Sequence, residues 1–80
     1  MTTFHNNSKI VLDYLEKHDE KPKAIRLHRS CYSQIGAFLE ENRTGYSYES
    51  ALEWLRGQTG PKALMGTYAA AVTRINDVYQ

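Results

Sequence analysis

Residues 21–39 read K-P-K-A-I-R-L-H-R-S-C-Y-S-Q-I-G-A-F-L, and this segment predicts the longest helix of the chain. Apolar or semi-polar side chains recur in it every three or four positions, the spacing of a helix with one buried stripe. Pro22 suits the first turn of such a helix, where its missing N–H would have no partner in any case. We therefore expect a helix over about residues 22–42.

The same segment carries cations but no Asp or Glu. At roughly 100° per residue, the face opposite the apolar stripe holds Lys23, Arg26, Ser30 and Ser33, with Arg29 at its edge. An exposed face normally mixes both signs of charge. A face of cations and short hydroxyls therefore indicates an anionic partner, and a nucleic-acid backbone is the one we favour. The alternative is a solubilising face that happens to lack acids.

The size and charge of the chain add two constraints. Its 80 residues make one domain, which buries only about 60–65% of its unfolded surface. The net charge of +1 does not identify a partner. Between Trp54 and Asn76, however, there is again no acid, while Arg56, Lys62 and Arg74 are basic. Two acid-free windows separated by acidic segments suggest a molecule with one basic side.

The cellular setting follows from what the sequence contains. Cys31 is the single cysteine, so an internal disulfide is impossible and a reducing compartment is expected. The chain opens on polar residues without a signal-peptide pattern. No apolar run approaches the roughly 20 residues needed to span a bilayer. We expect a soluble, cytoplasmic protein without a membrane partner.

The N-terminal part predicts a short helix behind a flexible segment. Residues 1–8 are expected to be a flexible N-terminus, and residues 9–80 the helical domain. Ser8 is a suitable N-cap for a first helix over about residues 9–18. Its apolar side would be formed by Ile10, Val11, Tyr14 and Leu15.

Two more helices complete the expected fold. The turn after the long helix contains Gly45, which is available for a left-handed conformation. Ser47 is the expected N-cap of a third helix over about residues 48–56, with Trp54 on its apolar side. A fourth helix is expected over residues 62–79. No alternation typical of a strand persists, so the fold class is all-α with four helices.

The fourth helix has an unusual outer face. Gly66, Ala70 and Thr73 lie opposite its apolar stripe, with Thr67 and Arg74 beside them. Glycine inside a helix costs about 1 kcal/mol relative to alanine. Small side chains let a backbone approach another surface closely, and that surface is either another helix or a DNA groove.

Three segments together resemble the N-terminal core-binding domain of tyrosine recombinases of the phage-integrase type. K-A-I-R-L-H-R-S-C-Y-S-Q-I-G-A-F-L-E-E-N (residues 23–42) looks like that family's long helix, which ends in an aromatic-Leu pair and acids. Y-S-Y-E-S-A-L-E-W-L (residues 46–55) looks like its short third helix, and Y-A-A-A-V-T-R-I-N-D-V-Y (residues 68–79) like its fourth. The resemblance covers roughly residues 8–80, and it rests on the order and spacing of the three segments.

The resemblance implies a four-helix, SAM-like orthogonal bundle that forms one half of a C-shaped clamp on double-stranded DNA. In that family the second and fourth helices face the DNA. The family's catalytic domain is absent from this chain, so we expect a chemically inert fragment of a larger recombinase, monomeric in isolation and assembling on DNA with the missing domain. Ile25 or Arg26, and His28, replace residues that are Thr and Tyr in many relatives, which bears on base-specific contacts more than on backbone contacts.

The leading hypothesis is therefore a DNA-binding module that acts mainly through phosphate contacts. Arg26 or Arg29 is the expected base reader, because a guanidinium can grip guanine with two hydrogen bonds. A helical protein-interaction module and a stand-alone DNA-binding regulator are the alternatives. The expected DNA-binding residues are Lys23, Arg26, Arg29, Ser30, Ser33, Lys62, Thr67 and Arg74.

No catalytic, metal or cofactor site is expected. His28 and Cys31 have a spacing that could serve a metal, but a structural zinc site needs four convergent ligands in most cases. Tyr14, Tyr32 and Tyr68 fall on apolar stripes and are expected in the core. Helix-end or surface roles are expected for Tyr46, Tyr48 and Tyr79.

Overall fold

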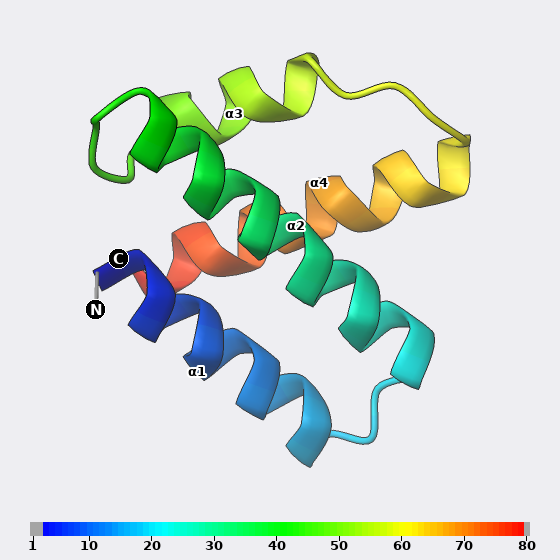
Figure 1. Ribbon diagram of the computed structural model, residues 1–80. Coiled ribbons are helices and arrows are strands. Elements are labelled where there is room, and N and C mark those ends of the chain that lie inside the picture. Colours follow the sequence, from blue (N-terminus) through cyan, green and yellow to red (C-terminus); the bar gives the residue numbers. More distant parts are fainter. Residues whose placement is uncertain (1–2, 80) are drawn as a thin grey trace.

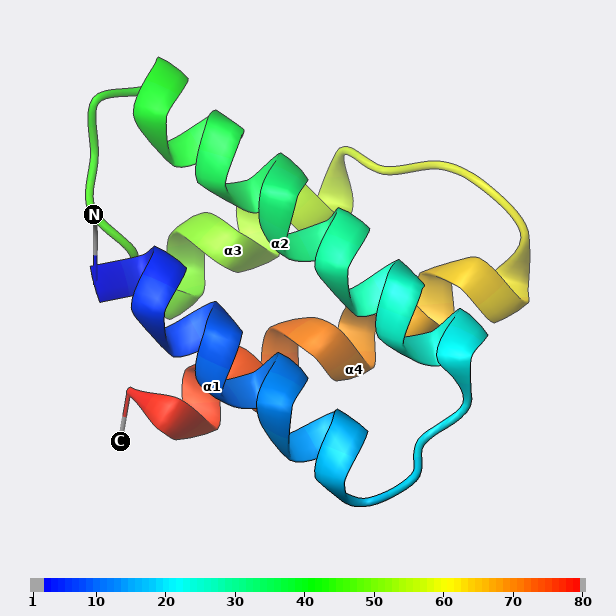
Figure 2. The same cartoon turned by 60° about the horizontal axis from the view of Figure 1, so that its bottom comes forward.

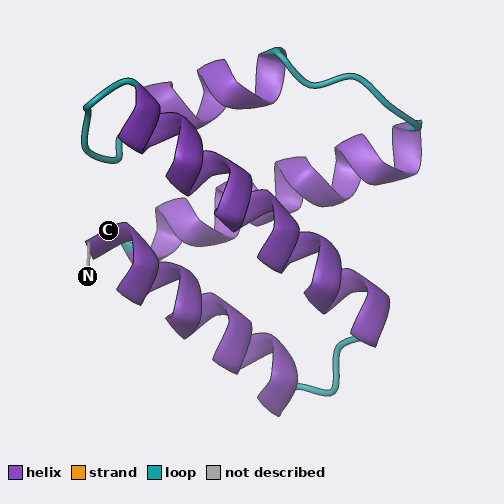
Figure 3. Cartoon of the chain, in the orientation of Figure 1, coloured by secondary structure: helices purple, strands orange, loops and turns teal. Residues whose placement is uncertain are grey.

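The structure, a computed structural model, describes residues 3–79 and contains four helices in that range (Figures 1 and 3). They are α1 (Thr3–Lys17), α2 (Pro22–Glu41), α3 (Tyr48–Arg56) and α4 (Lys62–Val78). Helices α1 and α2 lie side by side and run in opposite directions, α4 crosses behind α2, and α3 packs against α4 (Figures 1 and 2). The predicted all-α, four-helix class is confirmed.

The starts of the last three helices follow from local sequence. Pro22 occupies the first turn of α2, as expected, and Pro61 immediately precedes α4. Ser47 caps α3, since its hydroxyl oxygen accepts the backbone N–H of Ser50 at 3.1 Å. The predicted bounds of α2, α3 and α4 agree with the structure to within one residue.

The predicted start of the first helix is wrong. Helix α1 begins at Thr3 rather than near residue 9, and Ser8 lies buried inside it, donating its hydroxyl proton to the His5 carbonyl at 2.8 Å. The reason is tertiary: Phe4 is buried, edge-on to Tyr32 and stacked on Tyr46 with 5.7 Å between ring centroids. This packing stabilises a first turn that its polar sequence would not form alone. Of the predicted flexible segment, residues 1 and 2 lie outside the described range.

The left-handed conformation expected at Gly45 occurs elsewhere. Asp19 (φ 55°) and Arg43 (φ 52°) adopt it, just after α1 and α2. Behind α2, the N–H of Thr44 bonds to the Leu39 carbonyl at 3.0 Å and the N–H of Arg43 bonds to the Glu40 carbonyl at 3.1 Å. This paired pattern satisfies the last carbonyls of a helix and places the left-handed residue one position after its cap. The left-handed residue therefore comes two positions earlier than the glycine suggested.

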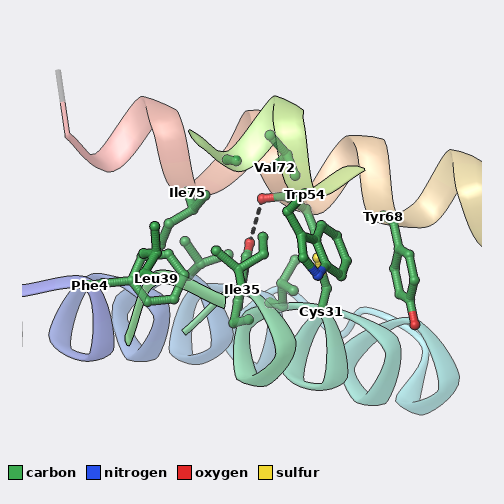
Figure 4. Packing of buried hydrophobic residues seen from close by; sticks show 13 residues of the cluster. Phe4, Cys31, Ile35, Leu39, Trp54, Tyr68, Val72 and Ile75 are labelled. Carbon is green, nitrogen blue, oxygen red and sulfur yellow. Dashed lines mark hydrogen bonds between the residues drawn. The ribbon is translucent and has the colours of Figure 1, made fainter. Parts of the chain in front are cut away.

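A single core joins all four helices (Figure 4). Tyr32, Tyr68 and Trp54 are buried in it, as their positions on the apolar stripes predicted. Tyr14 and Ile10 are not: they are 57% and 54% exposed, which corrects their assignment to the core. The largest side chains with almost no exposed surface are those of Leu15, Cys31, Ile35, Val72 and Ile75.

The two ends of the described chain meet on one aromatic residue. The Tyr46 ring, in the turn between α2 and α3, stacks on Phe4 from α1 and on Tyr79 just after α4, where the ring centroids are 4.1 Å apart. The Tyr46 hydroxyl also donates to the side-chain oxygen of Asn76 at 3.2 Å. Within residues 3–79, no helix has the length and apolar character needed to cross a bilayer.

Candidate nucleic-acid interface

The outer face of α2 is exposed along its length. Lys23, Arg26, Ser30 and Ser33 are all exposed, on the side of the helix away from its buried stripe. The first acidic side chain on this helix is Glu40, in its last turn. Over its first four turns, the helix therefore presents cations and hydroxyls to solvent without a carboxylate of its own.

Ser30 is oriented by an amide that the sequence did not single out. Gln34 Nε2 donates to Ser30 Oγ at 3.1 Å and also lies 3.3 Å from the hydroxyl oxygen of Tyr68 on α4. Ser30 thus accepts a hydrogen bond and keeps its own proton free for an external acceptor. The four-residue spacing of Ser30 and Gln34 on a helix was the available signal.

Arg29 differs from the other cations because a carboxylate lies beside it. Its Nη2 atom is 3.7 Å from Oε1 of Glu16 on α1, and both side chains are more than half exposed. Exposed pairs of this kind contribute about 0–1 kcal/mol. No acid of α2 therefore lies near Arg29, but Glu16 of α1 does.

The surroundings of Arg29 are mixed in charge. A groove of about 1240 Å³ runs between α1 and α2, and Arg29 and Ser33 line it. Its other charged lining residues are Lys9, Asp13, Glu16 and Glu40. Three acids against two bases make this flank of α2 less favourable to a phosphate backbone than the side bearing Lys23 and Arg26.

The DNA-binding residues expected on α4 differ in their exposure and in their hydrogen bonds. Lys62 is exposed at the start of the helix. Thr67 is half-buried and donates its hydroxyl proton to the Ala63 carbonyl at 3.1 Å, so it has no proton left for a phosphate oxygen.

Gly66, on the outer face of α4, faces open space: a Cβ built there would meet nothing within 4 Å. No helix in residues 3–79 covers this point, which removes packing within the described chain as its explanation.

Arg74 does not join the α2 face. It is half-buried and lines a hollow between α1 and α4. It is also close enough to His28 and Tyr32 to act on their ionisation. The predicted set is thus divided: Lys23, Arg26, Ser30 and Ser33 share one face, and Arg74 lies on another.

His28 is a buried polar residue directly beneath the outer face of α2. Only 3% of it is exposed, its Nδ1 lies 2.8 Å from the Ala24 carbonyl, and its Nε2 has no hydrogen-bond partner among residues 3–79. Burial is the main cause that lowers the pKa of His28, and the charge of Arg74 lowers it further. The Ala24 carbonyl and Glu20 oppose the shift. His28 is therefore held as a neutral imidazole.

The Cys31 thiol is buried in the core. Burial raises the pKa of the Cys31 thiol to about 12, so the reactive thiolate is not formed near neutral pH. Nowhere in residues 3–79 do three or more His, Cys, Asp or Glu side chains gather as metal ligands.

Comparison of the chain with protein-family models, with curated proteins and with solved structures found no match.

Proposed function

We propose that this chain is a DNA-binding module that holds duplex DNA mainly through its phosphate backbone. The observation that carries the proposal is the exposed face of α2, where Lys23 and Arg26 stand with Ser30 and the first carboxylate of the same helix is Glu40, in its last turn. Cations of this kind release counterions when they neutralise phosphates, which is the dominant, sequence-independent source of affinity for DNA.

The α2 residues contact DNA through different chemical groups. Lys23 and Arg26 supply positive charge, and the free hydroxyl proton of Ser30 can be donated to a phosphate oxygen or a base edge. Arg26 is the better candidate for a base reader, because Arg29 is partly neutralised by Glu16. From α4 we retain Lys62 as a phosphate contact, whereas Thr67 and Arg74 contribute less than their positions in sequence suggested.

The more specific part of the proposal is that the module belongs to a tyrosine recombinase, as its core-binding domain. Support comes from the resemblance of residues 23–42, 46–55 and 68–79 to that family and from the four-helix architecture that the resemblance implies. In this role the chain clamps the recombination site, and bond breakage in DNA is left to the catalytic domain of the parent protein. In this proposal the chain itself binds DNA without altering it.

Salt dependence tests the DNA-binding part. If about three to five phosphates are neutralised, a plot of log K against log salt falls with a slope of about −3 to −4.5. Fluorescence anisotropy of a labelled duplex, titrated with the chain at several salt concentrations, measures this slope. A slope near zero, or no binding at low salt, would reject the proposal. Salt-insensitive self-association without DNA binding would favour a protein-interaction module instead.

A further inference from the structure

Helix α1 carries a second apolar strip that the core does not use. Ile10 and Tyr14 are one helical turn apart, and each exposes more than half of its surface. The Tyr14 ring lies 4.1 Å from the His18 ring, centroid to centroid, so it rests along the helix instead of pointing into the core. The one other large apolar side chain exposed in residues 3–79 is Tyr48, on a different helix.

The strip borders a hollow shared with the end of α4. The hollow has a volume of about 360 Å³. Its lining residues are Ile10, Val11, Tyr14, Arg74, Asp77 and Val78. Exposed apolar groups gathered around a hollow and rimmed by charged groups are typical of a protein-binding surface.

The two charges at this rim have opposite signs, and neither is in an ion pair with another of residues 3–79. The ion pair found among residues 3–79 joins Arg29 and Glu16. Arg74 is half-buried and has no carboxylate of residues 3–79 within 4.0 Å, although Asp77 follows it by three residues on the same helix. A guanidinium that is partly removed from water gains from a carboxylate supplied from outside.

We propose that this surface binds a second copy of the same chain. A two-fold interface uses the same patch on both copies, so each residue contacts its counterpart's neighbours reciprocally. Arg74 then meets Asp77 of the second copy, Asp77 meets Arg74 of the second copy, and Ile10 and Tyr14 form the apolar centre. The patch satisfies this condition because it holds one cation, one anion and an apolar strip.

Duplex DNA is a poorer occupant of the same hollow. Asp77 repels a phosphate backbone, and two exposed apolar side chains gain nothing from a charged groove. In this proposal the isolated chain forms a weak dimer, whereas the sequence led us to expect a monomer. The surface is separate from the outer face of α2, so the proposal is independent of DNA binding.

Sedimentation equilibrium of the whole chain tests it, over protein concentrations from about 10 µM to about 1 mM. The six residues that line the hollow are far fewer than the roughly 20–30 a side of a stable interface, so we expect a weak, reversible contact. The average mass should therefore rise with concentration towards twice that of the monomer. Ile10→Ser and Tyr14→Ser should each weaken self-association about tenfold, since apolar side chains at an interface centre carry most of its affinity. Tyr48→Ser, an exposed aromatic outside the patch, should leave it unchanged.

A charge exchange identifies the partner as a second copy. Arg74→Glu and Asp77→Arg should each weaken self-association by bringing like charges together, whereas the double variant should restore it. Asp77 and Ile10 are exposed, so their variants should fold, and circular dichroism verifies folding for all of them. A monomer at every concentration, or a double variant that stays as weak as the single ones, would overturn the proposal. So would loss of DNA affinity in Arg74→Glu with no change in mass, because that result assigns the hollow to nucleic acid.

Discussion

The Tyr32 hydroxyl donates a 2.7 Å hydrogen bond to the carbonyl oxygen of Ala71, and this buried contact joins α2 to α4 where the two helices cross (Figure 4). Burial raises the pKa of Tyr32, so the phenol keeps its proton and remains a donor. The bond links the helix that carries the basic face to the helix that carries Arg74. It therefore contributes to the relative position of the outer face of α2 and the hollow between α1 and α4.

Tyr32→Phe should lower the free energy of unfolding by about 0.5–1.5 kcal/mol, the net contribution of one hydrogen bond. The loss should stay within that range because Ala71 lies inside α4, where a backbone N–H also bonds its carbonyl. Urea denaturation followed by circular dichroism measures the change. Tyr48→Phe, at an exposed tyrosine, is the matched control and should have no effect. Equal stability of the Tyr32 variant and the wild type would mean that the bond contributes nothing.

Trp54 should report folding directly. It is 6% exposed and packs against Tyr68, with ring centroids 5.5 Å apart. Its fluorescence should therefore be blue-shifted in the native protein and move to longer wavelength in denaturant. Trp54→Ala should cost about 3–5 kcal/mol, which is comparable with the whole stability of a small domain. Native emission already at the wavelength of exposed tryptophan would contradict this packing.

His28 should make the fold sensitive to mild acid. Its pKa in the folded state lies below the ordinary value of 6.5, so the unfolded chain binds a proton first as the pH falls. Its contribution to stability is thus complete above about pH 6.5 and is lost as the pH drops towards the folded-state pKa. The slope from this one group is at most about 1.4 kcal/mol per pH unit.

Measuring the free energy of unfolding between about pH 7.5 and pH 5 checks this expectation. His28→Gln, which cannot titrate, should flatten the dependence in that range even if its overall stability is lower. Parallel curves for the wild type and the His28 variant would show that another group is responsible.

Alanine variants of four basic residues can test whether the α2 face itself, and not the overall positive charge, binds DNA. Arg26→Ala should weaken DNA binding by about 1–3 kcal/mol if the side chain reads a base, and by less if it meets phosphate alone. Arg29→Ala should have a smaller effect, because Glu16 already pairs with it. Lys9→Ala and Lys17→Ala should change binding less than Arg26→Ala, since neither lysine belongs to the outer face of α2 and exposed charges are screened over about 8 Å at physiological salt. Equal losses for all four variants at one salt concentration would show that net charge alone matters.

Removing the acid beside Arg29 should have the opposite effect. Glu16→Gln deletes a negative charge 3.7 Å from the guanidinium, so DNA affinity should rise by up to about 1 kcal/mol. Glu53→Gln, at an exposed position of α3, changes net charge equally and serves as the control. If both variants gain equally, Arg29 does not contact DNA.

Short-range signals were sufficient for most of the fold. Pro22 and the Ser47 cap act within one turn of the backbone, so the bounds of α2 and α3 could be predicted from neighbouring residues alone. The spacing of apolar side chains likewise predicted that Tyr32, Tyr68 and Trp54 are buried. The same helical geometry predicted that Lys23, Arg26, Ser30 and Ser33 share an exposed face.

The short-range signals could not predict features that depend on which helices contact one another. The pattern of α1 allows either Phe4 with Leu15, or Ile10 with Tyr14, to face inward, and the contacts of Phe4 with Tyr32 and Tyr46 select the first. Left-handed Arg43 depends on hydrogen bonds that close the end of α2 rather than on the nearest glycine.

The candidate interface divides in the same way between local and long-range causes. The run of cations on α2 is local in sequence, and a single helix is enough to place it on one face. Its partial neutralisation is not local, because Glu16 comes beside Arg29 only when α1 and α2 pack in opposite directions. The separation of Arg74 from that face depends equally on how α4 crosses the other helices. Helical periodicity fixes the direction of a side chain around its own axis, whereas its neighbours are set by the crossing of helices that share one core.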